Sequence, residues 1–131
     1  MRVEITRVLD ATTARVAFRC AVGQASGHWA GRAPAAPGEF DVELEIPEEI
    51  ADWTVLGAPA AGSIVGDISG QAGVSITATV GGVGEGDDTV VELRLGSDIL
   101  LVEAPARRWE VSPGEVVALH VPSVRLYPYD L

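Results

Sequence analysis

The residues best able to do chemistry stand in two short aromatic and basic clusters. His28 and Trp29 lie between two glycines, and Arg107, Arg108 and Trp109 follow one another between two prolines. A guanidinium beside an indole can bind a carboxylate, a phosphate or the face of a base. If both clusters meet at one end of a barrel, their indoles within about 12 Å, they form a ligand site for an anionic small molecule or an acidic peptide terminus. In the alternative, the tryptophans only anchor loops.

The remaining reactive residue types do not form a catalytic set. Hydrolytic catalysis usually needs a nucleophile, a base and a group that orients the base. The chain offers only two histidines and one cysteine as candidates for the base and a thiol nucleophile. His120 alternates with the apolar Leu119 and Val121, so its ring is predicted to lie in solvent. Cys20 shares the parity of Phe18 and is predicted to act as a small apolar residue. We therefore expect no catalytic residues and no enzyme.

Metal and phosphate motifs are also missing from the sequence. The acidic stretch 84–88 lacks the spacing of an EF-hand and its final glutamate, and no Cys or His pair has zinc spacing. The glycines of 81–84 are not followed by the Lys-Ser/Thr pair of a phosphate loop. The sequence therefore predicts no metal site and no cofactor.

Charge narrows the choice of partner. Nineteen acidic residues against nine basic ones leave a net charge of −10. A negative field repels phosphate backbones and anionic lipid, so nucleic acid is disfavoured as a partner and no membrane binding is expected. A basic protein is the partner whose charge would be complementary.

The first residues and the cysteine content suggest a compartment. The N-terminus alternates polar and apolar residues without the apolar centre of a signal peptide. No apolar run reaches the roughly 18 residues of a spanning helix. A lone cysteine cannot form an internal disulfide, which suits a reducing compartment. We expect a cytoplasmic protein.

The elements that must position these residues are strands, because the apolar residues recur with period two. The chain is expected to form one all-β domain over residues 1–131, without a long helix. A loop is predicted over 23–38, one helical turn over 47–53 and a turn over 70–73. The alternating stretches stand at 2–6, 13–22, 40–46, 64–68, 74–80, 89–95, 115–121 and 124–128.

The most specific local prediction is a hairpin turning at Gly96 and Ser97, where glycine in the first position suits a type II′ turn. This register sets Leu93 opposite Leu100 on the apolar face. A second turn is predicted over 112–115, with proline second and glycine third. The predicted core residues are Val16, Phe18, Val42, Leu44, Ile76, Leu93, Leu100, Leu119 and Leu126.

Two further expectations concern strand neighbours. Prolines at 122 and 128 favour an edge position for the last strand. If strands 13–22 and 40–46 pair, Arg15 and Arg19 form cross-strand ion pairs with Glu43 and Glu45.

The segment from Asp88 to Tyr127 resembles the end of an OB- or TOBE-like barrel. It contains a tight hairpin, a loop, the Pro-Gly-Glu turn at 113–115 and a last strand that ends at Leu126, Tyr127 and Pro128. The resemblance implies a small antiparallel barrel, and a sandwich is the alternative. It includes no residue diagnostic of those families, so it implies no ligand.

Two functions follow as hypotheses. The first is a non-enzymatic, acidic interaction module, such as a subunit, an inhibitor or an immunity-like protein, that engages a basic protein partner. Open edge strands would serve such a module, and they also predict a homodimer through an edge strand. The alternative is a small-ligand-binding barrel whose site lies at the barrel end near the His28 and Trp109 loops.

Overall fold

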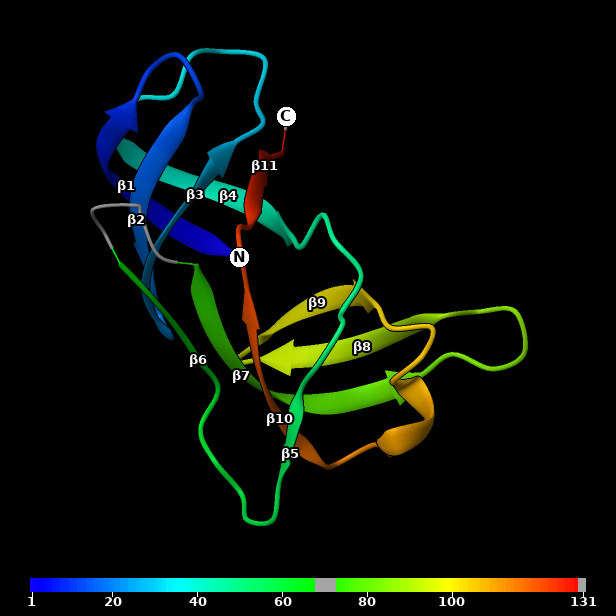
Figure 1. The fold of residues 1–131 in the computed structure, drawn as a ribbon. Helices are drawn as coiled ribbons and strands as arrows, with labels where there is room; N and C mark the ends of the chain where they lie inside the picture. The colour runs from blue at the N-terminus through cyan, green and yellow to red at the C-terminus, as the bar shows by residue number, and fades with distance from the viewer. Residues whose placement is uncertain (68–72, 130–131) are drawn as a thin grey trace.

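The computed structural model describes residues 1–67 and 73–129 and shows a chain built from strands (Figure 1). The predicted all-β class without a long helix is confirmed, since the described helical structure is one short 3-10 helix, η1 (Arg108–Glu110). The strands are β1 (Arg2–Asp10), β2 (Arg15–Cys20), β3 (Gly23–Trp29), β4 (Gly38–Glu45), β5 (Thr54–Leu56), β6 (Ser63–Gly66), β7 (Val74–Val83), β8 (Val90–Leu95), β9 (Asp98–Glu103), β10 (Val116–Val121) and β11 (Arg125–Pro128).

Five strands close into a barrel in the order β1-β2-β3-β11-β4, which confirms the predicted small barrel. β11 completes it, pairing antiparallel with β4 and parallel with β3. The expected edge position of the last strand is therefore wrong. Pro128 is the final residue of β11, and the β3 pairing uses only Arg125 and Leu126. Pro128 pairs with Val42 of β4, but its backbone nitrogen faces the β3 side beyond the residues paired there, so the missing N–H costs no ladder bond.

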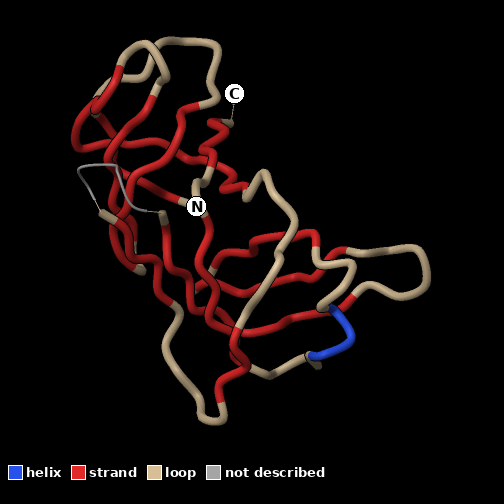
Figure 2. Tube along the Cα trace, in the orientation of Figure 1, coloured by secondary structure: helices blue, strands red, loops and turns tan. Residues whose placement is uncertain are grey.

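A second group of strands surrounds the long strand β7, which pairs with β6, β8 and β10. β5 pairs with β10, and β9 pairs with β8. β6 also pairs with β3, through Gly23 with Ile64 and Gln24 with Val65, and so connects the two groups (Figure 2). One continuous hydrophobic core lies between them, and all nine predicted core residues belong to it. Of the strands in the C-terminal third of the chain, which resembled the end of a barrel, only β11 belongs to the five-stranded barrel.

The loop predicted over 23–38 is half wrong, because its first part is strand β3. Before its final Trp29, this strand consists of small and polar residues, whose types do not favour a strand. The packing explains their size: a Cβ on Gly27 would lie 2.7 Å from Cδ1 of Leu126 and 3.0 Å from the carbonyl oxygen of Val124. Small residues let β3 approach β11 closely enough to close the barrel.

The helical turn predicted over 47–53 is also wrong. The segment contains no helical residues and crosses from β4 to β5. Its apolar side chains, Ile50 and Trp53, are buried, and the N–H of Ile50 donates to the carbonyl oxygen of Glu103 at 2.8 Å. Anchoring to the core and to β9 overrides the local preference for a turn.

The other local predictions agree with the structure where it describes them. Leu93 lies opposite Leu100, and Gly96 has a φ of 65°. The 112–115 turn carries a hydrogen bond from the N–H of Glu115 to the carbonyl oxygen of Ser112 at 3.1 Å. Of the turn predicted over 70–73, all but residue 73 lies outside the described residues.

Candidate functional site

The candidate site is a groove between β4 of the barrel and β9 of the second group. One end is a cavity of about 310 Å³ lined by residues 42–44, 97–101 and 129, among others. The other end has a volume of about 320 Å³, with residues 43–47 and 101–103 in its walls. The lower-numbered residues of both strands lie at the same end, so β4 and β9 run in the same direction. We call this feature the β4–β9 groove.

The wall formed by β9 is an open strand edge. In an antiparallel ladder, alternate residues bond to the neighbouring strand, and the residues between them direct their N–H and C=O groups outward. Glu103 belongs to the outward set, since its carbonyl accepts the N–H of Ile50. Ile99 and Leu101 have the same parity as Glu103 and lie between β8-bonded residues. Their backbone groups therefore face the groove, and no backbone partner for them is found within residues 1–67 and 73–129.

Large apolar side chains are exposed along the groove. Ile99 is 57% exposed, Leu101 56% and Tyr129 55%. They are three of the six large hydrophobic residues exposed in the described part of the chain. Concentrated exposed apolar area is typical of interaction surfaces, whereas scattered single residues are not.

The wall formed by β4 supplies negative charge. Glu43 and Glu45 are exposed and alternate with the buried Val42 and Leu44. The ion pairs expected from Arg15 and Arg19 do not form, because β1 lies between β2 and β4. Arg19 instead pairs with Glu4 at 2.7 Å. For Glu43 and Glu45, the described residues provide no ion pair.

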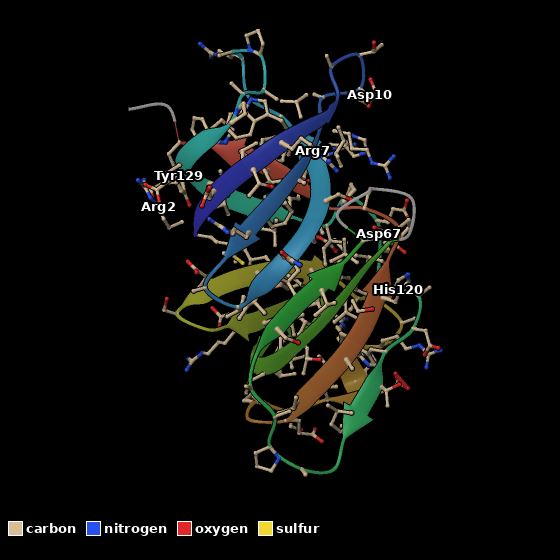
Figure 3. The ribbon with its side chains drawn as sticks, turned by 90° about the vertical axis from the view of Figure 1, so that its left-hand side faces the viewer. Arg2, Arg7, Asp10, Asp67, His120 and Tyr129 are labelled. Carbon is tan, nitrogen blue, oxygen red and sulfur yellow. The ribbon has the colours of Figure 1, made fainter. Side chains whose placement is uncertain are left out.

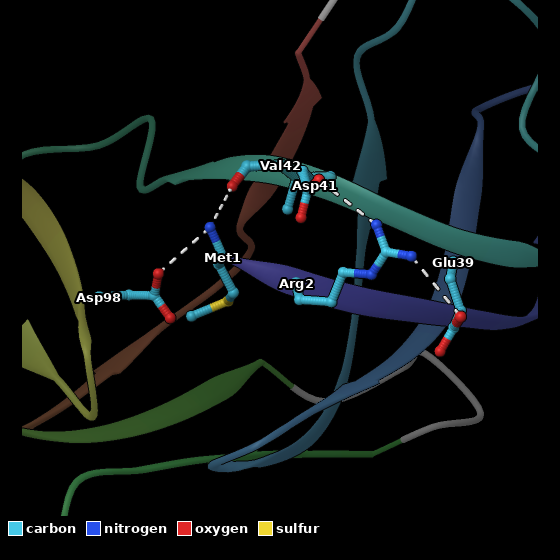
Figure 4. A network of polar contacts seen from close by, with 6 residues as sticks. All are labelled: Met1, Arg2, Glu39, Asp41, Val42 and Asp98. Atoms are coloured by element: carbon cyan, nitrogen blue, oxygen red, sulfur yellow. Dashed lines mark hydrogen bonds and ion pairs between the residues drawn. The ribbon is translucent and has the colours of Figure 1, made fainter.

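The N-terminus closes one end of the groove (Figure 4). The ammonium of Met1 donates to the carbonyl oxygen of Val42 at 2.8 Å and pairs with the carboxylate of Asp98 at 3.2 Å. This contact ties β4 to β9. The hydrogen bond from Ile50 to Glu103 limits the groove at its other end, so the open edge of β9 lies between these contacts.

The predicted site residues His28 and Trp29 belong to β3. Trp29 is buried and packs edge-on against Phe40, with ring centroids 4.9 Å apart. Its indole N–H donates to the carbonyl oxygen of Ala33 at 3.0 Å. Nδ1 of His28 lies 3.2 Å from the carbonyl oxygen of Thr13. These contacts fit the alternative in which the tryptophan anchors a loop.

Arg107 and Arg108 are both engaged within the chain. Arg108 is buried and donates to the carbonyl oxygens of Asp88 and Gly86. Its guanidinium lies 4.3 Å from the ring centroid of Trp109, which is 67% exposed. Arg107 pairs with Glu110 at 3.1 Å, and with Asp52 at 3.7 Å. Arg108 thus holds the acidic 84–88 stretch and lies over the ring of Trp109.

The structure does not bring the two predicted clusters together. The end of β3 lies among the barrel loops, and η1 lies at the far end of the second group of strands (Figure 1). His120 is exposed on β10, opposite Ser75 in the register, with 3.0 Å between Nδ1 and Oγ (Figure 3). This is a cross-strand side-chain pair of the kind that stabilises a sheet.

Sequence reasoning missed the apolar residues of the groove, although the sequence carries a signal for them. Residues 99–102 form an unbroken apolar run, so both faces of that strand are apolar. One face packs on the core, and the other, with Ile99 and Leu101, is exposed. No pattern in the sequence indicates that Glu43 and Glu45 have no ion pair with the described residues, because this depends on the strand order.

Comparison with protein-family models, with curated proteins and with solved structures finds no match to this chain. In the described part of the chain, no helix has the length and apolar character needed to cross a membrane.

Proposed function

We propose that the protein is a non-enzymatic binding module that engages a basic partner protein through the β4–β9 groove. The observation that carries this proposal is the combination found along the groove. Exposed Ile99 and Leu101, an open strand edge and the carboxylates of Glu43 and Glu45 line the same surface. An apolar centre with a charged rim is the usual anatomy of a protein interface.

The charge of the whole chain supports a basic partner. The net charge of −10 attracts a basic protein at long range and raises its rate of encounter. The two groove glutamates then favour basic side chains at short range, because they have no described ion pair of their own. Affinity would come mainly from the apolar contacts, and selectivity from the charges.

The competing small-ligand barrel has less support from the described contacts. Its residues are occupied by intramolecular contacts: Trp29 with Phe40, and Arg108 with the 84–88 stretch. Only Trp109 among them presents a large exposed surface.

A selection from a random peptide library tests the proposed function. The protein and its Glu43→Gln/Glu45→Gln variant are immobilised separately and used to select peptides from the same library. We expect the unmodified protein to enrich arginine- and lysine-containing peptides that also carry apolar residues, and the variant to lose the basic enrichment. Selected peptides without a basic bias, or equal enrichment on both proteins, would refute the proposal.

A further inference from the structure

We infer that the partner contributes a short extended segment that adds antiparallel to the outer edge of β9, with basic and apolar residues alternating along it. This inference rests on the proposed function and specifies how the partner binds. It follows from the unpaired backbone groups of Ile99 and Leu101 and from the different chemistry of the two faces of β9.

The length of the segment follows from the ends of the open edge. The ammonium of Met1 holds Asp98 at one end, and the N–H of Ile50 occupies the carbonyl oxygen of Glu103 at the other. Between them, Ile99 and Leu101 offer their N–H and C=O groups. A strand advances by about 3.4 Å per residue, so about five residues of a partner span this stretch. Antiparallel addition gives the slightly more stable ladder.

The residues of the segment that bond to β9 should be basic. In antiparallel pairing, the residues directly opposite Ile99 and Leu101 exchange backbone hydrogen bonds with them, and their side chains lie on the same exposed face. Across the groove, that face carries Glu43 and Glu45. Arginine and lysine suit this position, because their stems pack on the apolar Ile99 and Leu101 while their charged ends reach the carboxylates.

The intervening residues of the segment should be apolar. Their backbone groups face away from β9, and their side chains lie on the same face as Leu100 and Val102. Both of these residues are buried, as is Leu44 on the β4 side. A polar side chain placed there would lose its hydration without a described partner, whereas a small apolar one extends the core.

A second copy of this chain fits the groove less well than a basic segment. Each copy carries a net charge of −10, so two copies repel one another. The β9 strand of a second copy would also bring no basic side chain to the carboxylates of Glu43 and Glu45.

Labelled peptides provide the test, with fluorescence anisotropy as the readout. The main probe has about seven residues, with arginine and valine alternating, and the control has the same composition with the arginines and valines in separate blocks. Two further probes are N-methylated, one at the arginines and one at the valines. We expect N-methylation of the arginines to weaken binding about tenfold or more and N-methylation of the valines to have little effect.

A protein variant tests the same contact from the other side. Leu101→Pro removes the N–H that faces the groove and leaves the β8 ladder bonds intact, and proline is tolerated at such edge positions. Leu101→Ala is the matched control, because it shortens the side chain but keeps the N–H. Binding of the alternating peptide should fall further in the proline variant than in the alanine variant, with both variants checked for folding by circular dichroism.

The outcomes separate the two proposals. Equal binding of alternating and block peptides, lost in Glu43→Gln/Glu45→Gln, would overturn strand addition and leave the basic-partner function standing. Equal effects of the two N-methylation patterns would also overturn strand addition. A dimer that forms through β9 and excludes the peptide would overturn it in favour of a second copy. No binding of any basic peptide would refute both proposals.

Discussion

Arg107 and Arg108 are adjacent in the chain, but their side chains contribute differently to the stability of the fold. Arg107 makes exposed ion pairs with Glu110 and Asp52, and such pairs contribute little to stability. Arg108 is buried, and two carbonyl oxygens of the 84–88 stretch accept its hydrogen bonds. Removing it takes away both hydrogen bonds, and hydrogen bonds from a charged donor contribute more to stability than neutral ones.

Replacing the two arginines separately tests this difference. Arg108→Met should lower the free energy of unfolding by about 2–4 kcal/mol, because two hydrogen bonds from a buried, charged donor are lost. Arg107→Met, the matched control, should change it by less than about 1 kcal/mol. Urea denaturation followed by tryptophan fluorescence measures both. Equal losses in the two variants would show that burial does not distinguish them.

At the level of elements, the β8–β9 hairpin and β3 show what local sequence can and cannot predict. In the hairpin, the Gly96-Ser97 turn and the apolar alternation specify the same register, so Leu93 could be placed opposite Leu100 from sequence. In β3, the residues are small because β11 must come close, and β11 lies about a hundred positions later in the chain. A constraint imposed by so distant a segment leaves no local pattern to read.

The same distinction applies to the β4–β9 groove. The apolar run over 99–102 was visible in the sequence, and its excess apolar face could have been noticed. That Glu43 and Glu45 have no ion pair with another described residue depends on β1 lying between β4 and β2. Strand order is a property of the whole chain, so this half of the candidate site could not be predicted from residue spacing.

The hairpin register can be tested by two leucines on its opposite faces. Leu93→Ala removes a fully buried side chain and should cost about 2–5 kcal/mol, through lost burial and the cavity left behind. Leu101→Ala changes an exposed side chain of the same size and should cost less than about 0.5 kcal/mol. Chemical denaturation gives both values. A loss below about 0.5 kcal/mol for Leu93→Ala would contradict the register.

The close approach of β3 and β11 has its own test. Gly27→Ala places a methyl group 2.7 Å from Leu126 and should lower stability by about 1–3 kcal/mol through overpacking. Gly57→Ala is the control, because a Cβ at that position would meet no atom within 4 Å. Thermal unfolding compares the two variants. If Gly27→Ala is no less stable than Gly57→Ala, close packing does not explain the glycine.

For the whole molecule, the excess of acidic residues affects every association. A basic peptide is attracted by the net charge of −10, whereas a second copy is repelled by it. Salt screens both effects, since the Debye length falls from about 10 Å at 0.1 M to about 3 Å at 1 M. The two kinds of association should therefore respond to salt in opposite directions.

Added sodium chloride should weaken binding of the alternating basic peptide and favour any dimer through an edge strand. Sedimentation velocity follows the mass of the protein, and anisotropy follows the peptide, over the same salt series. We expect the dimer fraction to rise, and the peptide affinity to fall about tenfold or more, between about 0.1 and 1 M salt. A peptide affinity that does not change with salt would show that charge has no part in binding.

The position of β4 between β1 and β11 determines how the molecule responds to a pulling force. Both neighbours run antiparallel to β4, and residues 1 and 129 contact adjacent positions of it, Val42 and Asp41. Met1 and Tyr129 therefore lie level with one another on the two sides of β4, and a force that separates them acts across the strands. The hydrogen bonds to β4 lie along that direction, so they open one after another from the pulled ends. The barrel should therefore offer little mechanical resistance when these two residues are pulled apart.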